Sequence, residues 1–182
     1  MVERELNWAW YESALGRLLL GSTPSGLAYV GLDVEREPAG LARLARSRAL
    51  ELAAEPHSSA GILCAAARQL GEYALGQRRD FELPLDPGGT EFQRAVWREL
   101  RSIPYGATLT YGKVAARLGQ PGAARAVGLA AGRNPLPIVV PCHRLLSSTG
   151  LGGFSAGIDR KRALLALEGR APGQQQEKLP WA

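Results

Sequence analysis

The sequence predicts an α+β protein of two domains: a small antiparallel sheet with helices, followed by a helical domain with a helix-turn-helix. Residues 1–88 first give short apolar runs separated by turn residues, and then segments whose apolar side chains recur at helical spacing. Residues 89–170 give short helical segments separated by turns that contain glycine or proline. A chain of 182 residues is long enough for one domain or two small ones.

The first half is expected to begin with strands and continue with helices. The turn residues Ser22–Gly26 join two apolar runs and therefore predict a hairpin. Pro38 can start a helix, and Gly76 can end a second one. His57 and Cys64 are interpreted as structural or neutral. The expected elements are a strand at 8–12, a hairpin of 17–21 with 27–32, a helix from Pro38 to about Ala54, a loop at 55–61, a helix from about Ile62, and a short extended piece at 81–85.

The second half is expected to start at Gly89, after a boundary at Leu85–Gly89, and to end near residue 170, where a flexible tail (171–182) begins. Thr90 and Gln93 have the spacing of a capping box at a helix start. Two further helices, at 110–119 and at about 123–133, flank a tight turn and have the form of a helix-turn-helix. A last helix follows Asp159. Its first-turn basic residues 160–162 are equally consistent with phosphate contacts and with solvated side chains.

Charge is divided unequally between the halves. Residues 1–88 hold 9 basic and 12 acidic side chains, whereas residues 89–182 hold 13 and 5, and no acidic residue lies between Glu99 and Asp159. Such a basic half predicts a polyanionic partner, nucleic acid first. The helix at 123–133 consists almost entirely of small residues, which indicates either tight helix packing or close approach to nucleic acid. The charge pattern favours the second interpretation.

The segment 134–145 carries the candidate nucleophile. Pro137 and Pro141 enclose three apolar residues, and proline restricts both its own φ and the residue before it. We therefore expect a short, buried, extended strand that delivers Cys142 and His143 to a turn. An isolated Cys-His pair is more often a buried cysteine beside an ordinary histidine. With only two cysteines in the chain, no disulfide framework is expected, and Cys142 is interpreted as a free thiol in a reducing, intracellular compartment.

Seven short motifs of the second half occur in the order and spacing of one family, and the first half adds weaker similarity at 13–20 and 23–27. The chain thereby resembles the O6-alkylguanine-DNA alkyltransferases, the methylated-DNA–protein-cysteine methyltransferases of direct DNA repair. The resemblance implies a ribonuclease-H-like N-terminal domain and a helix-turn-helix or winged-helix type C-terminal domain that carries the active site. The motifs are Gly89–Trp97, Ile103–Gly106, Thr110–Gly112, Ala123–Gly128, Asn134–Pro137, Val140–Arg144 and Leu151–Ser155.

The resemblance implies a catalytic group of five residues. Cys142 would take an alkyl group from O6 of guanine, and probably from O4 of thymine, irreversibly and once per molecule. His143 would relay the thiol proton through water, and Glu168 would orient that histidine. Asn134 would brace the turn, and Tyr111 would donate a proton or hydrogen bond to N3 of the base. From the residues alone, Glu168 could be an exposed helix end, Asn134 an ordinary Asn-Pro turn, and Tyr111 a half-buried packing residue.

The resemblance also implies how DNA is bound. The target base would be flipped out of double-stranded DNA, with Arg125 filling the vacated space and the small-residue helix in the minor groove. Lys113, Ala123, Ala124 and Gly128 are the other expected DNA contacts. The expected pocket is lined by Tyr111, Ala131, Pro137, Leu145, Phe154 and Ser155, where Ser155 would donate to O6. The family commonly has tyrosine at the position of Phe154, so one hydroxyl contact is expected to be missing.

Several classes of protein and ligand are not expected. No apolar run approaches the ~20 residues of a membrane span, and residues 1–7 do not resemble a signal peptide. No metal and no cofactor are expected, because His57 and Cys64 are too few for a closed zinc site. We expect a cytoplasmic monomer, nucleoid-associated if the host is bacterial. Two rival functions are a non-catalytic damage sensor, which the presence of Cys142 disfavours, and a Cys-His hydrolase or acyltransferase, which the charge pattern disfavours.

Overall fold

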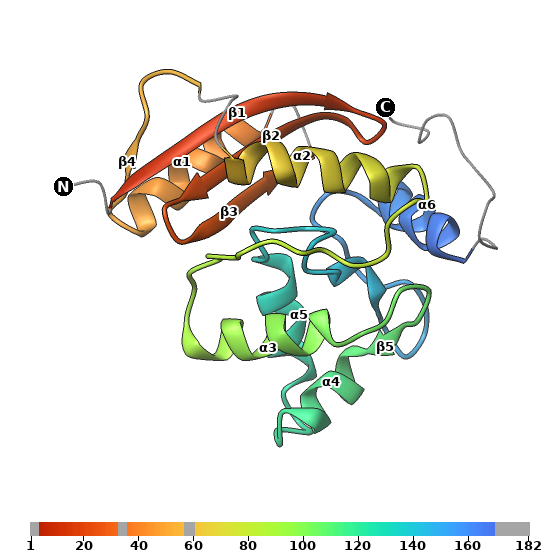
Figure 1. Cartoon of the computed structure of the whole chain (residues 1–182). Helices are drawn as coiled ribbons and strands as arrows, with labels where there is room; N and C mark the ends of the chain where they lie inside the picture. Colours follow the sequence, from red (N-terminus) through yellow and green to blue (C-terminus); the bar gives the residue numbers. More distant parts are fainter. Residues whose placement is uncertain (1–3, 33–35, 57–60, 170–182) are drawn as a thin grey trace. The chain divides into compact units, whose positions relative to one another are not determined.

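The computed structural model describes residues 4–32, 36–56 and 61–169 (Figure 1). The chain divides into two compact units, of which the first ends at Gly88 and the second begins at Gly89. The predicted loop position of His57 and the predicted tail at 171–182 lie outside the described residues.

The first unit is built on a four-stranded sheet with the order β3-β2-β1-β4. Its strands are β1 (Glu5–Ser13), β2 (Gly16–Thr23), β3 (Gly26–Gly31) and β4 (Glu51–Leu52). β1, β2 and β3 form an antiparallel meander, which confirms the predicted hairpin, although β1 is longer than the expected strand at 8–12. β4 runs parallel to β1 and was not predicted, because two residues carry too little pattern to be recognised.

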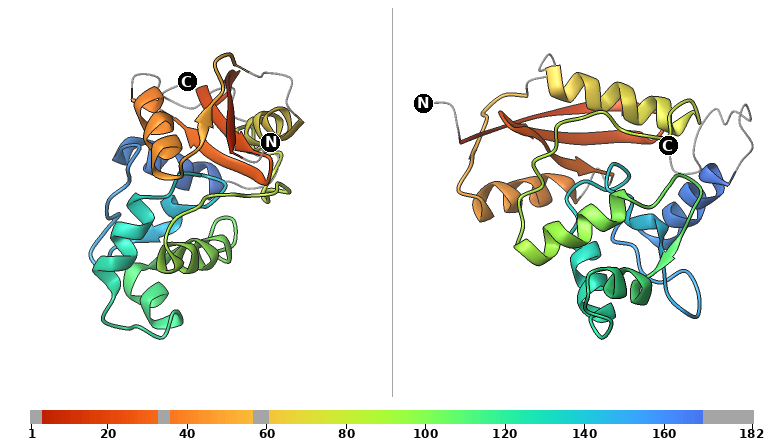
Figure 2. Two further views of the ribbon diagram at one scale, coloured as in Figure 1. Left: turned by 90° about the vertical axis from the view of Figure 1, so that its left-hand side faces the viewer. Right: turned by 60° about the horizontal axis from the view of Figure 1, so that its bottom comes forward.

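Both faces of this sheet are covered by helices (Figure 2). Successive side chains of a strand point to opposite faces, and three successive residues of β2, Leu18, Leu19 and Leu20, are all buried. Helix α1 (Glu37–Ser47) packs Leu41 and Ala45 against Leu6 and Leu19 on one face. Helix α2 (Gly61–Ala74) covers the other face with its buried residues, which include Leu63, Leu70 and Tyr73.

The predicted helix from Pro38 to about Ala54 is wrong in its second half. α1 ends at Ser47, and Ala49 adopts a positive φ of 50°, a conformation that a helix cannot contain. The backbone N–H of Leu50 then closes the end by donating to the carbonyl of Ala45, over 2.9 Å. Beyond this turn, residues 51–53 hydrogen-bond with the start of β1. Tertiary pairing of β4 therefore overrides a helical spacing that continues through Leu52.

The second unit is mainly helical. Its elements are α3 (Glu91–Arg101), β5 (Leu109–Thr110), α4 (Tyr111–Arg117), α5 (Ala124–Gly132), the 3-10 helix η1 (Cys142–Arg144), β6 (Leu145–Leu146) and α6 (Ile158–Glu168). The helix-turn-helix prediction corresponds to α4 and α5, joined through Gly119, which has a φ of 72°. The indole N–H of Trp97 in α3 donates to the carbonyl of Ala130 in α5 over 3.0 Å, which fixes the rotation of α5 in the unit.

The start of α3 confirms the predicted capping box. Thr90 Oγ1 accepts from the backbone N–H of Gln93 at 3.2 Å, and Gln93 Oε1 accepts from the backbone N–H of Thr90 at 2.9 Å. Both bonds satisfy N–H groups that have no partner within a helix. The position of Trp97, and through it of α5, depends on the helix that this cap begins.

We predict that Thr90→Ala lowers the free energy of unfolding by about 1 kcal/mol, the usual effect of losing a helix N-cap. Urea denaturation followed by tryptophan fluorescence would measure the change. Thr90→Ser is the matched control, because it keeps the hydroxyl and should stay close to the parent chain. Equal destabilisation by alanine and serine would contradict a capping role.

Candidate active site

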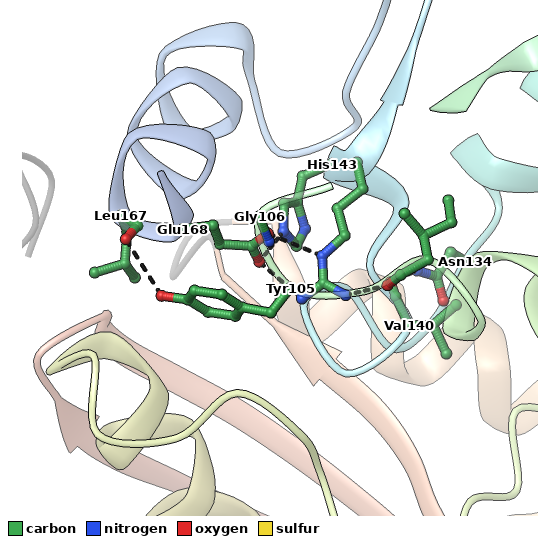
Figure 3. Close-up of polar contacts among 9 residues, drawn as sticks. Tyr105, Gly106, Asn134, Val140, His143, Leu167 and Glu168 are labelled. Carbon is green, nitrogen blue, oxygen red and sulfur yellow. Dashed lines mark hydrogen bonds and ion pairs between the residues drawn. The ribbon is translucent and has the colours of Figure 1, made fainter. Parts of the chain in front are cut away.

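Asn134 organises the loop that carries Cys142. Its Nδ2 donates to the carbonyl of Val140 at 2.8 Å (Figure 3). The same Nδ2 lies 3.2 Å from Cys142 Sγ. Its Oδ1 accepts from the backbone N–H of Leu136 at 3.0 Å. One amide side chain therefore ties the beginning of the loop to its end and contacts the sulfur. The structure brings Asn134 and Cys142 together, as the resemblance implies.

The segment between Pro137 and Pro141 is a turn, so the prediction of an extended strand here is wrong. Ile138 has a positive φ of 74°, and the backbone N–H of Val140 reaches back to the carbonyl of Leu136 at 2.8 Å. A positive φ is unusual for a β-branched residue, and here the Asn134 bonds hold the chain on both sides of it. The apolar run is still buried, with 5% or less of each side chain exposed, because the whole turn is inserted into the unit.

Cys142 is a buried thiol at the first position of η1, with 5% of its surface exposed. Burial raises the pKa of Cys142, while the hydrogen bond from Asn134 and the positive charge of Lys161 act in the opposite direction. Burial disfavours the thiolate, which is the nucleophilic form. At neutral pH this cysteine is therefore a thiol, and its use as a nucleophile requires a base.

His143, Glu168 and Arg144 form a buried chain of charge and hydrogen bonds. His143 Nε2 lies 2.7 Å from Glu168 Oε1 (Figure 3). The Arg144 guanidinium donates to both carboxylate oxygens of Glu168 at 2.9 Å. All three side chains are buried, with at most 5% of each residue exposed. Glu168 is the last residue of α6, so folding closes the 25-residue separation that the sequence leaves between it and His143.

The electrostatics of this chain determine the state of the histidine. Burial acts to raise the pKa of Glu168, but the hydrogen bonds from His143 and Arg144 outweigh it and hold the pKa at about 2. Burial lowers the pKa of His143, and Glu168 only partly opposes this. At neutral pH the carboxylate is ionised and the imidazole is neutral. An ionised carboxylate can only accept, so Nε2 carries the proton and Nδ1 keeps its lone pair as a base.

Arg144 belongs to the basic stretch without acidic residues between Glu99 and Asp159, but it is not a surface cation. Its guanidinium is buried, and Nη1 also donates to the carbonyl of Ile103 at 2.5 Å. Glu168 Oε2 accepts from the backbone N–H of Gly106 at 3.1 Å, and Tyr105 Oη donates to the carbonyl of Leu167 at 3.2 Å (Figure 3). These bonds fasten the turn after α3 to the end of α6.

Lys161 is a site residue that sequence reasoning missed. Neither expectation for 160–162 fits it: its side chain is fully buried, and Nζ donates to the carbonyls of Leu145 and Leu151 at 2.5 Å and of Gly153 at 3.2 Å. Burial lowers the pKa of Lys161, whereas the Cys142 thiolate would raise it. An ammonium group needs such acceptors when it is buried. The only sequence signal is helical spacing: Lys161 lies three residues before Leu164 and so shares the buried side of α6, whereas Arg162 does not.

The glycine-rich loop after η1 contacts Tyr111. A Cβ on Gly152, which has a φ of 69°, would lie 2.8 Å from Tyr111 Oη, and one on Gly128 would lie 3.7 Å from the ring. Tyr111 Oη also donates to the carbonyl of Gly153 over 3.4 Å. Burial raises the pKa of Tyr111, so its hydroxyl remains a proton donor across the neutral range. Tyr111 is therefore held between α5 and the loop, and is not an isolated packing residue.

The remaining predicted pocket residues differ in exposure. Ala131, Pro137 and Leu145 are buried, Phe154 is half-buried, and Ser155 is exposed. The Phe154 ring meets the His143 ring edge-on, with centroids 6.5 Å apart, so the aromatic wall persists without a hydroxyl. The loop before it closes a small turn of its own, where the backbone N–H and Oγ of Ser147 both donate to the carbonyl of Gly150 at 2.9 Å.

The predicted DNA contacts lie on α4 and α5. Arg125 and Lys113 are exposed, whereas Ala123, Ala124 and Gly128 are half-buried. Within the described parts of the chain there is no group of three or more His, Cys, Asp or Glu side chains that could hold a metal ion. Among the helices of those same parts, none is both long enough and apolar enough to cross a membrane.

Comparisons with known proteins identify the family of this chain. Residues 91–170 match the model of the 6-O-methylguanine DNA methyltransferase DNA-binding domain. A methylated-DNA–protein-cysteine methyltransferase of Methanosarcina acetivorans is 40% identical over 163 residues, which cover 89% of this chain and 97% of that protein. The chain belongs to the O6-methylguanine DNA methyltransferase family. It therefore has the family's activity, the repair of O6-methylguanine in DNA by methyl transfer to a cysteine of the protein.

Two further comparisons agree with this. A relative of the same name from Mycolicibacterium paratuberculosis is 57% identical over 106 residues, 58% of this chain and 64% of that protein. The crystal structure of Mycobacterium tuberculosis OGT in complex with DNA superposes with a TM-score of 0.70 at 38% identity, covering 93% of this chain and 96% of that one. The fold of both units is thus that of known family structures, and DNA is the partner of the chain.

The depressed pKa of Glu168 predicts a pH-dependent stability. A carboxyl whose pKa is about 2 in the folded chain, against an ordinary value of 4.5, stabilises the fold fully above pH 4.5 and loses this contribution as pH falls towards 2. The free-energy difference between the parent chain and Glu168→Gln should therefore shrink by about 3 kcal/mol across that window. Urea denaturation at several pH values would measure it.

A surface carboxylate provides the control for this prediction. Hydrogen bonds from Arg78 and Arg68 lower the pKa of Glu72 as well, but on the surface of α2 water screens these charges. Glu72→Gln should therefore show a much weaker pH dependence than Glu168→Gln. Equal slopes for the two variants would contradict the assignment of the effect to the buried network.

Proposed function

We propose that Cys142 is the acceptor cysteine and that it takes the alkyl group from O6 of guanine irreversibly, once per molecule. The observation that carries this assignment is the juxtaposition of a buried thiol, braced by Asn134, with a neutral histidine whose tautomer is set by the ionised Glu168. Cys64, the other cysteine of the chain, is exposed on α2. Nothing in the residues around Cys142 hydrolyses a thioether, so each molecule reacts once.

The proposed reaction moves one alkyl group and one proton in balance. Nδ1 of His143 accepts the Cys142 proton, through a bridging water as the family resemblance implies. The thiolate attacks the alkyl carbon, an S–C bond forms, and the C–O6 bond breaks with its electron pair going to the guanine. Tyr111 donates a hydrogen bond to N3, which makes the guanine a better leaving group, and the proton that leaves Cys142 stays on His143 until it passes to the departing guanine or to solvent. Ser155 donates to O6, and the backbone carbonyls of Cys142 and Leu145 accept from the exocyclic amine.

We propose that the partner is double-stranded DNA that contains O6-alkylguanine, bound by a monomer, and that O4-alkylthymine is a second substrate. A base inside a duplex cannot reach a buried thiol and must be flipped out, which costs a few kcal/mol of stacking. Arg125, exposed on α5, would fill the vacated space. The half-buried small residues Ala123, Ala124 and Gly128 would allow α5 to approach the minor groove, and Lys113 would contact the backbone. Such work belongs in the cytoplasm, at the nucleoid in a bacterial host.

Intact mass measurement tests the acceptor. After incubation with a duplex oligonucleotide that contains O6-methylguanine, we expect a gain of one methyl group, located on the peptide of Cys142. Cys142→Ala should gain no mass and repair nothing, while Cys64→Ala should react like the parent chain. Tight binding without any gain in mass would support a damage sensor instead, and repair by Cys142→Ala would exclude this cysteine as the acceptor.

The role of His143 predicts a change in pH profile. Because burial raises the pKa of the thiol, removal of the base by His143→Ala should slow single-turnover repair at pH 7 by about 10²–10⁴-fold. The remaining rate should keep rising with pH through the alkaline range, as free thiolate forms. Lys113→Ala at saturating DNA is the control, and should keep the parent pH profile. A His143→Ala variant with the parent profile would contradict the proton relay.

A further inference from the structure

Leu129 is an anomaly on the surface of α5. It is 62% exposed, and among the described residues only one other large hydrophobic side chain, Leu52, belongs to the exposed class. A single exposed leucine is common on protein surfaces and needs no explanation by itself. Its position on α5, the helix proposed above to face DNA, makes this one informative.

The orientation of α5 directs Leu129 outward together with Arg125. Val127, Ala130 and Ala131 are buried, and the Trp97 indole bonded to the carbonyl of Ala130 holds that face inward. Residues four apart share one face of a helix, so Leu129 follows Arg125 by one turn on the outer face. Arg125, Ala126 and Gly132 are exposed around it. Leu129 is thus the only bulky apolar side chain on the exposed face of α5, beside the small residues Ala126 and Gly132.

The charge around Leu129 fits a nucleic acid. Between Glu99 and Asp159 the sequence has no acidic residue, and the exposed cations Lys113, Arg125 and Arg133 lie on α4, on α5 and directly after α5. Four helical residues rise by about 6 Å, close to two base steps of about 3.4 Å each. Where α5 runs along the groove, side chains at Arg125 and Leu129 can therefore reach levels of one duplex that are about two base steps apart.

We propose that Leu129 is a second positioning residue for base flipping, an apolar wedge that enters the minor groove beside the nucleotide that Arg125 replaces. This rests on the proposed function of α5. Apolar wedges between base steps are a general means of holding a duplex open and bent. Opening exposes base faces and sugar C–H groups to water, and a leucine that covers them removes apolar surface on both sides. Leu129 contacts DNA only and takes no part in the transfer at Cys142.

Repair rates on two substrates test this role. We expect Leu129→Ala to slow single-turnover repair of O6-methylguanine in a duplex by roughly tenfold, as truncation of a buried contact residue does. Repair of the same lesion in a single strand, where no duplex has to be opened, should change by less than about twofold. Leu129→Met keeps the length of the apolar side chain and should restore the duplex rate. Alanine suits an exposed helix position, so folding should be preserved.

Leu52→Ala, at the other exposed leucine, is the matched control and should leave both rates unchanged. Two results would overturn the wedge: a duplex rate for Leu129→Ala that matches the parent chain, or an equal loss on duplex and single strand. Failure of the proposed function is a different result, because the parent chain would then repair neither substrate.

Discussion

The second unit depends on the hydrogen bonds and ion pairs made by the buried carboxylate of Glu168. It lies at the C-terminal end of α6, where the helix dipole disfavours an anion, and its burial would favour protonation. Arg144, His143 and the backbone N–H of Gly106 together keep it ionised. Its charge holds His143 in one tautomer, and its contacts join α6 to η1 and to the turn after α3. The fold and the proposed chemistry therefore depend on the same group, and removal of the carboxylate would leave a buried arginine without its counter-ion.

Much of the fold could be predicted from the sequence, because it follows local rules, whereas the roles of the site residues came from the family resemblance and remain predictions. The Thr90 capping box, the hairpin at Ser22–Gly26 and the helix-turn-helix are set by neighbouring residues. What could not be predicted depends on contacts between distant residues. β4 pairs with β1 against its helical spacing, and the turn at Ile138 is held by Asn134. Lys161 differs from Arg162 only in which side of α6 it occupies.

The inner and outer faces of α5 have different environments: the inner face packs within the unit and the outer face is exposed. Its inner face is fixed by Trp97 and by the packing of Val127 and Ala130, so the outer face is presented without freedom to rotate. If α5 contacts DNA as proposed, its rigidity suits recognition of a damaged duplex, because the position of Arg125 relative to Tyr111 is then set before DNA arrives. Gly128 contributes from the same helix, since its missing side chain leaves room for the Tyr111 ring. In the proposed function, the DNA-contacting helix α5 therefore also packs against the proposed proton donor, Tyr111 of α4.

Lys161 gives the loop after η1 a property that its glycine content does not suggest. Its ammonium group donates to the carbonyl of Leu145, before the Ser147–Gly150 turn, and to the carbonyls of Leu151 and Gly153, after it. The turn closes on itself through Ser147, and its tip, Ser148 and Thr149, is exposed. That segment could grow longer or carry a grafted peptide while Tyr111 and Phe154 keep their places. The fold thus contains an attachment point within a few residues of the sulfur of Cys142.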